Sequence, residues 1–286
     1  MSAERKHPDF PSQQGAVALK RAAPAWLAAY EAQGFAVLPA FVDTAWIEAL
    51  RGAVEAVQHS VANLSDAERA RLVFERDLSV KGRGGIAAEA VGDALFILGE
   101  PETFDPLFLR LLSWPPLVQA AQHALGTDAV VGHFMNVTIK HPRFGRAIGW
   151  HRDFPNAYIC PEGPDFLRLM LCLDGMDAQS GATGFVPGTH RVSDEAAREA
   201  KRHEDTHGTS VPDPAMVQTV LCAPGDLVLI HPKVLHGGGM NTSTRPRRNV
   251  VMQIGRATAP LVTAYRESST GLALSGQVSR LLAQRG

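Results

Sequence analysis

The sequence predicts a mainly β fold, an antiparallel sandwich or jelly roll with flanking helices and a helical N-terminal region. From Val130 onward, short runs rich in β-branched and aromatic residues alternate with turn sequences such as PEGPD, DAQSG and APGD. Most of these runs follow one another without a helix long enough for a parallel crossover, which argues against a doubly wound sheet. At 286 residues, 45% of them hydrophobic, the chain can bury a sizeable core.

The N-terminal part opens with a polar stretch, and residues 1–15 are expected to form a loose leader. A short helix is expected to begin at Pro24, because proline suits the first helical turn, and to stop at Gly34. The run FAVL that follows is rich in β-forming residues and predicts a strand. The segment 16–126 as a whole is expected to be mostly helical and to flank the β core.

Further helices in this flank carry their own boundary signals. Asp43 or Thr44 can cap a helix whose apolar residues recur at helical spacing. Ser65 and Glu68 have the spacing of a capping box, which marks the start of another helix. The stretch DPLFLRLLSWPPLVQAAQHALG is expected to be helical, interrupted at its two adjacent prolines and closed by its final glycine, Gly126.

Six β runs are expected between residues 127 and 257, where they would form the jelly-roll core. One helix or lid, VSDEAAREAKRH, is expected to interrupt them. No linker rich in proline, serine or glycine divides the chain, so we expect a single domain over residues 1–286 that ends in a tail or helix over 258–286. The six runs read VVGHFMNVTI, FLRLMLCL, TGFVP, VQTVL, DLVLI and NVVMQI.

Composition narrows the class of function. A formal net charge of −1 gives no electrostatic footprint for nucleic acid or an anionic membrane, so neither partner is expected. The three cysteines form no Cys-x-x-Cys pair and argue against a disulfide framework or a structural zinc site. No apolar segment approaches the length of a membrane span. We expect a cytoplasmic monomer or homodimer.

Three His-x-Asp triplets begin at His7, His151 and His203. With 11 histidines and 29 acidic residues, roughly one His-x-acid triplet is expected by chance, so the triplet alone is weak evidence for a metal. His7 lies in the leader, and His203 is expected on the charged face of the lid. Only His151 and Asp153 have the neighbours of a strand end inside the β core.

Residues two apart on a strand point to the same face, so His151 and Asp153 can both reach one ion. An iron(II) site made of two histidines and one carboxylate needs a second histidine from a distant strand. His231 and His236 are the candidates. We favour His236, because it opens a glycine-rich turn into the next β run, whereas His231 closes the preceding strand and can serve as a cap or hydrogen-bond donor there.

Arg247 follows His236 by 11 residues (247 − 236) and enters the last β run. An enzyme that pairs iron(II) with a 2-oxo acid must bind the far carboxylate of that acid inside a narrow barrel. Arginine suits this task because its planar fork meets a carboxylate with two charge-assisted hydrogen bonds. The flanking Arg245 and Arg248 are expected to belong to a solvated basic turn.

The chain resembles the phytanoyl-CoA dioxygenase family, a branch of the iron(II)/2-oxoglutarate oxygenases. The resemblance rests on YEAQGFAVLPAFVD, WHRD, SGATGFVPGTH and PGDLVLIHPKVLHGGGMNTSTRPRRN, and on their order along the chain. It implies a double-stranded β-helix, or cupin-like jelly roll, with iron on the two histidines and the aspartate already named. It also implies 2-oxoglutarate on Arg247 and near Asn136. Met170 stands where many members have tryptophan, and Gly238 where many have serine, so we expect co-substrate packing to differ there.

The same resemblance implies that the enzyme consumes dioxygen and 2-oxoglutarate, hydroxylates a small molecule, and releases succinate and carbon dioxide. The carboxylate of Asp153 favours hydroxylation, because related halogenases lack a carboxylate at that position. A metal-dependent cupin enzyme that does not use 2-oxoglutarate would share the barrel and the histidines, but it would have no use for Arg247. A noncatalytic ligand-binding jelly roll would need none of the three metal ligands.

The substrate is less well specified by the sequence. If strand alternation points Arg168 into the barrel, its charge must meet either an anionic substrate group or a nearby acid such as Asp174 or Asp177. Arg146 lies close to the metal motif in sequence, and Arg83 lies in a glycine-rich loop. We expect these three arginines to contact a small anionic substrate, with the lid helix closing over it.

Overall fold

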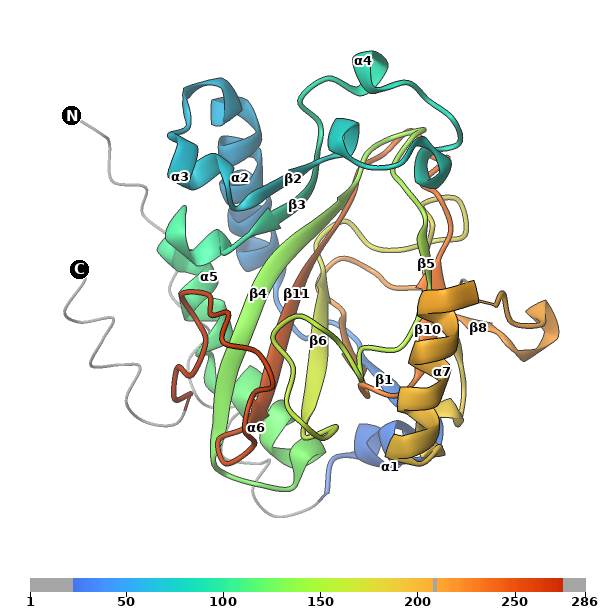
Figure 1. The fold of residues 1–286 in the computed structure, drawn as a ribbon. Helices are drawn as coiled ribbons and strands as arrows, with labels where there is room; N and C mark the ends of the chain where they lie inside the picture. Colours follow the sequence, from blue (N-terminus) through green and yellow to red (C-terminus); the bar gives the residue numbers. More distant parts are fainter. Residues whose placement is uncertain (1–22, 208–209, 275–286) are drawn as a thin grey trace.

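The computed structural model describes residues 23–207 and 210–274. Two antiparallel sheets make up the β core (Figure 1). The larger one contains, in spatial order, β1 (Phe35–Leu38), β9 (Leu227–Ile230), β6 (Phe166–Cys172), β11 (Arg247–Arg256), β4 (Val130–Lys140), β3 (Leu95–Gly99) and β2 (Leu72–Phe74). The smaller one contains β5 (Ile148–His151), β10 (Leu235–Gly238), β7 (Thr183–Val186) and β8 (Gln218–Thr219).

Helices pack on one face of the larger sheet, and the smaller sheet lies toward its other face. Figure 1 shows α2, α5 and α6 on one side of β4 and β11, and β5 and β10 on the other. The helices are α1 (Ala25–Gln33), α2 (Thr44–Ser60), α3 (Asp66–Arg69), α4 (Ala88–Val91), α5 (Pro106–Leu112), α6 (Pro115–Leu125) and α7 (Asp194–His207). Short 3-10 turns span Val61–Asn63, Glu75–Asp77, Val80–Arg83, Pro101–Thr103, Thr189–Arg191 and Pro214–Met216.

Strand alternation separates the two faces of the larger sheet. On β6, Leu167, Leu169 and Leu171 are fully buried in the core that the sheet shares with the helices. Met170 and Cys172, which alternate with these leucines, belong to a second apolar cluster on the opposite face. The same period of two on β4 and β11 turns their polar residues toward the smaller sheet. A cavity therefore lies on that face.

The predicted helix boundaries are confirmed. The carboxylate of Asp43 accepts a hydrogen bond from the backbone N–H of Trp46 and caps α2. Ser65 and Glu68 form the expected capping box at α3. Gly34 ends α1 with a φ of +88°, and a side chain there would also strike the ring of His190. Backbone freedom and space thus both require glycine at that position.

The mostly helical character predicted for residues 16–126 is incomplete, because this segment also contributes three strands to the larger sheet. β1 was predicted, whereas β2 and β3 have three and five residues at the edge of the sheet and are too short to show alternation. The lid prediction corresponds to α7. Residues 258–274 contain no helix and make isolated bridges at Leu261 and Ala273. The leader over residues 1–15 and the tail beyond residue 274 lie outside the described residues.

The structure differs from the expected turn after His236, because HGG belongs to strand β10. Glycine often marks a turn, but here the glycines of β10 allow this strand to pack closely between its neighbours β5 and β7. A Cβ on Gly237 would lie 3.1 Å from the backbone of Trp150, and one on Gly238 would lie 3.2 Å from the carbonyl oxygen of Ala182. Within residues 23–207 and 210–274, no helix combines the length and apolar character needed to cross a bilayer.

Candidate metal centre and adjoining cavity

Pairing of β5 with β10 brings two histidines from distant parts of the sequence face to face. His151 is the register partner of His236, and their ring centroids lie 4.3 Å apart. Asp153 follows directly beyond the end of β5. One ligand atom from each of these three residues lies within 4.8 Å of the other two, as in a site for a metal ion.

Backbone carbonyls orient both imidazole rings. Nδ1 of His151 lies 2.8 Å from the carbonyl oxygen of Gly149, and Nδ1 of His236 lies 3.0 Å from that of Val234. A carbonyl can only accept, so Nδ1 donates and Nε2 keeps its lone pair. The two Nε2 atoms lie 3.6 and 3.8 Å from the carboxylate of Asp153. Burial, with His151 acting in the same direction, lowers the pKa of His236 to about 4 and keeps its ring neutral.

Asp153 is completely buried, and neither of its oxygens accepts a hydrogen bond from the described residues. Nη1 of Arg168 lies 2.8 Å from Oδ1 and forms an ion pair with it. Burial raises the pKa of Asp153, but the positive charges of Arg168, His236 and His151 outweigh burial and bring that pKa below its ordinary value. The carboxylate is therefore ionised and can serve as a ligand to a metal ion.

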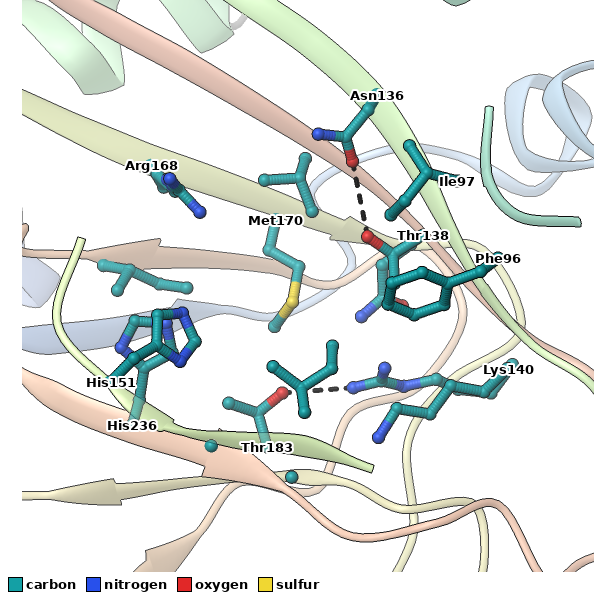
Figure 2. Close-up of a pocket in the computed structure, with 17 residues that line it drawn as sticks. Phe96, Ile97, Asn136, Thr138, Lys140, His151, Arg168, Met170, Thr183 and His236 are labelled. Atoms are coloured by element: carbon teal, nitrogen blue, oxygen red, sulfur yellow. Dashed lines mark hydrogen bonds between the residues drawn. The ribbon is translucent and has the colours of Figure 1, made fainter. Parts of the chain in front are cut away.

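A cavity of about 220 Å³ adjoins the two histidines of the cluster. Figure 2 shows His151 and His236 on one side of it, Lys140 on the other, and Met170 between them. Three basic residues, Lys140, Arg168 and Arg247, are among the described residues that line the cavity, and no acidic residue is. A cavity with this lining favours an anion.

We call the end of the cavity away from the two histidines the inner end. Arg247 lies there and is 2% exposed. Its Nη2 donates to Oγ1 of Thr183 at 3.1 Å and lies 3.0 Å from Sδ of Met176, while Nε has no partner among the described residues. No acidic side chain of those residues forms an ion pair with it. Burial lowers the pKa of Arg247 to about 10, so the guanidinium remains charged. A buried cation of this kind needs an anionic ligand.

Lys140 was missed by the sequence analysis and is the register partner of Arg247 across β4 and β11. It is fully buried, and its Nζ donates to the carbonyl oxygens of Gly181 and Gly239. Burial, together with the nearby charge of Arg247, lowers the pKa of Lys140 to about 6. Lys140 follows Asn136 by four residues and so lies on the same face of the strand. This spacing could have identified Lys140 as a cavity residue.

The structure places Asn136 and Met170, the two residues expected near the co-substrate, on the cavity wall. Asn249, which the sequence analysis did not single out, also lines the cavity, and its buried Oδ1 has no hydrogen-bond donor among the described residues. Thr138, next to Asn136 on the cavity side of β4, donates its hydroxyl to Oδ1 of that asparagine (Figure 2). The inner end therefore offers several polar groups beside the guanidinium of Arg247 and the amine of Lys140.

Two of the three arginines expected to contact the substrate lie outside the cavity. Arg83 is buried in its loop, where its guanidinium donates to backbone carbonyls, including that of Ile86 at 2.6 Å. Arg146 donates to the carbonyl of Ser79 at 3.0 Å and lies 3.6 Å from the carboxylate of Glu75. Both side chains thus bind the loop over residues 75–86.

The ion pairs of Arg168 and Arg248 also differ from expectation. Arg168 lines the cavity and pairs with Asp153, not with Asp174 or Asp177. Arg248 is not solvated: it is 5% exposed and pairs with Asp174 and also with Glu55. Arg245 does remain in an exposed turn, where it pairs with Asp177. The two faces of β11 explain the contrast between Arg247 and Arg248, because one faces the cavity and the other faces an acidic pair.

His231 is not part of the histidine and aspartate cluster. Its Nδ1 accepts a hydrogen bond from the backbone N–H of Lys233 at 3.1 Å, which matches the role of a cap at the end of β9. His203 lies on α7, the expected lid helix. The second histidine of the cluster is therefore the one favoured from its glycine-rich context.

The family model for phytanoyl-CoA dioxygenase (PhyH) matches residues 30–249. An ectoine dioxygenase of Bordetella bronchiseptica is 27% identical over 210 residues, which cover 66% of this chain and 68% of that protein. An L-proline trans-4-hydroxylase of Streptomyces griseoviridis is 27% identical over 203 residues, 63% of this chain and 75% of that protein.

Among solved structures, that of EctD from S. alaskensis with bound Fe superposes with a TM-score of 0.66 at 20% identity. The superposition covers 90% of this chain and 86% of that one. At this level of identity the likeness concerns the fold. It confirms the double-stranded β-helix with flanking helices that the sequence predicts.

Proposed function

The chain belongs to the phytanoyl-CoA dioxygenase family of iron(II)- and 2-oxoglutarate-dependent dioxygenases, and we propose that it hydroxylates a small molecule and releases succinate and carbon dioxide. One observation carries this proposal: a cluster of two histidines and one carboxylate shares a cavity with a buried arginine that has no acidic partner among the described residues. The first arrangement suits a cation with open coordination positions, and the second suits a carboxylate.

His151, Asp153 and His236 would hold the iron. Their fit rests on two features of the chain. The Nδ1 atoms of both histidines are engaged by backbone carbonyls, which aims the Nε2 lone pairs at the centre of the cluster. The carboxylate of Asp153 is buried and ionised, its one ion-paired guanidinium among the described residues is that of Arg168, and neither oxygen accepts a hydrogen bond there, so the group can also bind a metal ion.

Arg247 would bind the far carboxylate of 2-oxoglutarate through its guanidinium fork. Thr183 already orients that guanidinium, and Lys140 lies beside it as a second donor. Asn136 and Met170 would contact the co-substrate from the cavity wall between the arginine and the metal ligands. A buried arginine without an acidic partner is costly in the absence of an anion, so this arginine favours the binding of a carboxylate.

When bound, iron(II) and 2-oxoglutarate supply the oxidative chemistry that splits dioxygen between succinate and the substrate. The chain's own residues bind, orient and exclude water. Phe96, Ile148 and Val251 give the cavity an apolar wall that limits the access of water to the reacting atoms. The aspartate at position 153 would be one of the metal ligands, and we expect it to favour hydroxylation over transfer of another ligand.

We propose that the substrate is small and bears an anionic group. In support, the cavity is modest in size, its lining is basic, and the two relatives named above act on ectoine and L-proline, which are small carboxylates. A cytoplasmic location agrees with the free thiols of Cys160, Cys172 and Cys222. Whether the protein is a monomer or homodimer stays a prediction.

The proposal is tested by uncoupled turnover. Purified protein is incubated with iron(II), ascorbate and 2-oxoglutarate in air, and succinate is measured against time. We expect iron-dependent succinate formation that is lost in His236→Ala and preserved in Arg245→Gln, a matched exposed site. A protein that binds iron but forms no succinate and shows no affinity for 2-oxoglutarate would instead be a metal-dependent cupin enzyme of another kind.

A further inference from the structure

Arg168 and Asp153 form an ion pair whose two members face different surroundings. Asp153 is completely buried and is not part of the cavity lining, whereas Arg168 lines the cavity with its side chain 18% exposed. Nη1 of Arg168 and Oδ1 of Asp153 lie 2.8 Å apart. The positive member of the pair is therefore the one that a molecule in the cavity would meet.

Two further side chains hold the guanidinium of Arg168 in place. Its Nε lies 3.4 Å from Oε1 of Gln253, whose own amide is fixed by donation to the carbonyl of Ile159 and by contact with Nδ1 of His133. The guanidinium also lies over the ring of Phe134, with its central carbon 5.2 Å from the ring centroid. These contacts fix the group on the metal side of the cavity, as Figure 2 shows for Arg168 beside His151 and His236.

Charge balance at this end of the cavity changes when a metal binds. Without a metal, Asp153 neutralises Arg168. A divalent ion takes up the charge of Asp153 and that of the near carboxylate of 2-oxoglutarate, while the far carboxylate goes to Arg247 at the inner end. Among the described residues Arg168 has no second acidic partner. One positive charge therefore stays uncompensated beside the metal, in partly desolvated surroundings.

We propose that Arg168 binds an oxyanion of the primary substrate, a carboxylate or a phosphonate, once a metal occupies the cluster. This inference rests on the proposed function and specifies its substrate. Arginine is suited to both groups because its fork makes paired charge-assisted hydrogen bonds with carboxylates and with phosphorus oxyanions. The anchor would place C–H bonds near the anionic group close to the metal and so determine which position is hydroxylated.

The test uses full-length protein loaded with manganese(II) and saturated with 2-oxoglutarate. Manganese broadens the proton resonances of any ligand held near it. We add acetate, methylphosphonate or acetamide and measure the width of the methyl signal. Acetate or methylphosphonate should be broadened and uncharged acetamide should not, and the stronger of the two identifies the class of oxyanion. Arg168→Gln should reduce that broadening about tenfold, the effect of losing a charge-assisted hydrogen bond.

Controls separate the possible failures. Arg168→Lys should retain part of the broadening, and Arg245→Gln, at an exposed arginine, all of it. Unchanged broadening in Arg168→Gln would overturn the inference and leave the proposed function intact, provided that the methylene signals of 2-oxoglutarate are broadened. Failure to broaden those signals in the wild-type protein would contradict the proposed function as well. Loss of manganese from Arg168→Gln would also overturn the inference, because Arg168 would then support Asp153.

Discussion

The two ends of the cavity differ in how their charged side chains are paired. At the metal end, the negative charge of Asp153 is matched by Arg168, and both histidines have free Nε2 lone pairs. At the inner end, Arg247 and Lys140 lie together with hydroxyl, carbonyl and thioether partners but without an ion-paired acid among the described residues. One end is built for a cation and the other for an anion.

The two histidines and the two basic residues of the inner end also come from different sheets. His151 and His236 belong to β5 and β10 of the smaller sheet, whereas Lys140 and Arg247 belong to β4 and β11 of the larger one. Each end is thus positioned by its own strand pairing. We expect substitutions at one end to change the binding of one ligand and leave the other nearly unaffected, because within the described part of the chain no hydrogen bond or ion pair joins the two sets of side chains.

Removing a metal ligand should have the largest effect. His236→Ala should lower metal affinity by more than about 100-fold, since that is the upper range for losing only an outer partner of a ligand. Succinate formation should fall with it. Metal content is measured after dialysis, and the circular dichroism spectrum serves as the control for folding. Metal retained at wild-type affinity would show that the cluster is not the iron site.

Arg247→Ala should have the next largest effect, and at the other end. Two charge-assisted hydrogen bonds would be lost, so the affinity for 2-oxoglutarate should fall about 100-fold while metal content stays unchanged. Arg247→Lys should lie between, because lysine keeps the charge and lacks the fork. Calorimetric titration with 2-oxoglutarate under nitrogen checks this. A parallel loss of metal would break the division between the two ends.

Lys140 should make the inner end sensitive to pH. Its pKa of about 6 in the free protein is low because of burial, and a carboxylate bound beside it would raise that pKa. Binding of 2-oxoglutarate then takes up a proton, and the affinity should fall about tenfold as the pH rises from about 6 to 8. Lys140→Met should flatten this dependence. An equally steep profile in the Met variant would assign the proton to another group.

The smallest effect should come from packing around the histidines. A methyl group in Gly237→Ala would press on the backbone of Trp150 and shift β10 relative to β5, which should weaken metal binding a few-fold at a cost of about 1–3 kcal/mol in stability. Gly239→Ala is a matched control, because a Cβ there meets nothing within 4 Å. Thermal unfolding and metal titration of both variants test this. Affinity for 2-oxoglutarate should stay constant in each.

Much of this arrangement could be predicted from local pattern. The spacing of His151 and Asp153 near the end of a strand, and the distance from His236 to Arg247 along the chain, are features that a single sequence displays. The helix caps at Asp43 and Ser65 were predictable for the same reason, because each depends on residues within four positions. These elements required no knowledge of distant contacts.

The residues whose roles were not predicted correctly are those that depend on contacts between distant segments. Lys140 is one lysine on a strand, and only the approach of the Gly181 and Gly239 carbonyls makes it a buried inner-end residue. Arg248 looked solvated until Asp174 and Glu55 were brought to it by other elements. Arg83 lies in a loop whose own carbonyls surround it, which glycine content alone does not reveal.

The most direct test of the two-ended cavity is a crystal structure of the protein grown with iron(II) and 2-oxoglutarate under nitrogen, with anomalous data collected at the iron edge. The account predicts one anomalous peak bonded to Nε2 of His151, Nε2 of His236 and the carboxylate of Asp153, with the far carboxylate of 2-oxoglutarate on Arg247. An iron peak elsewhere, or a co-substrate whose far carboxylate lies away from that arginine, would contradict it.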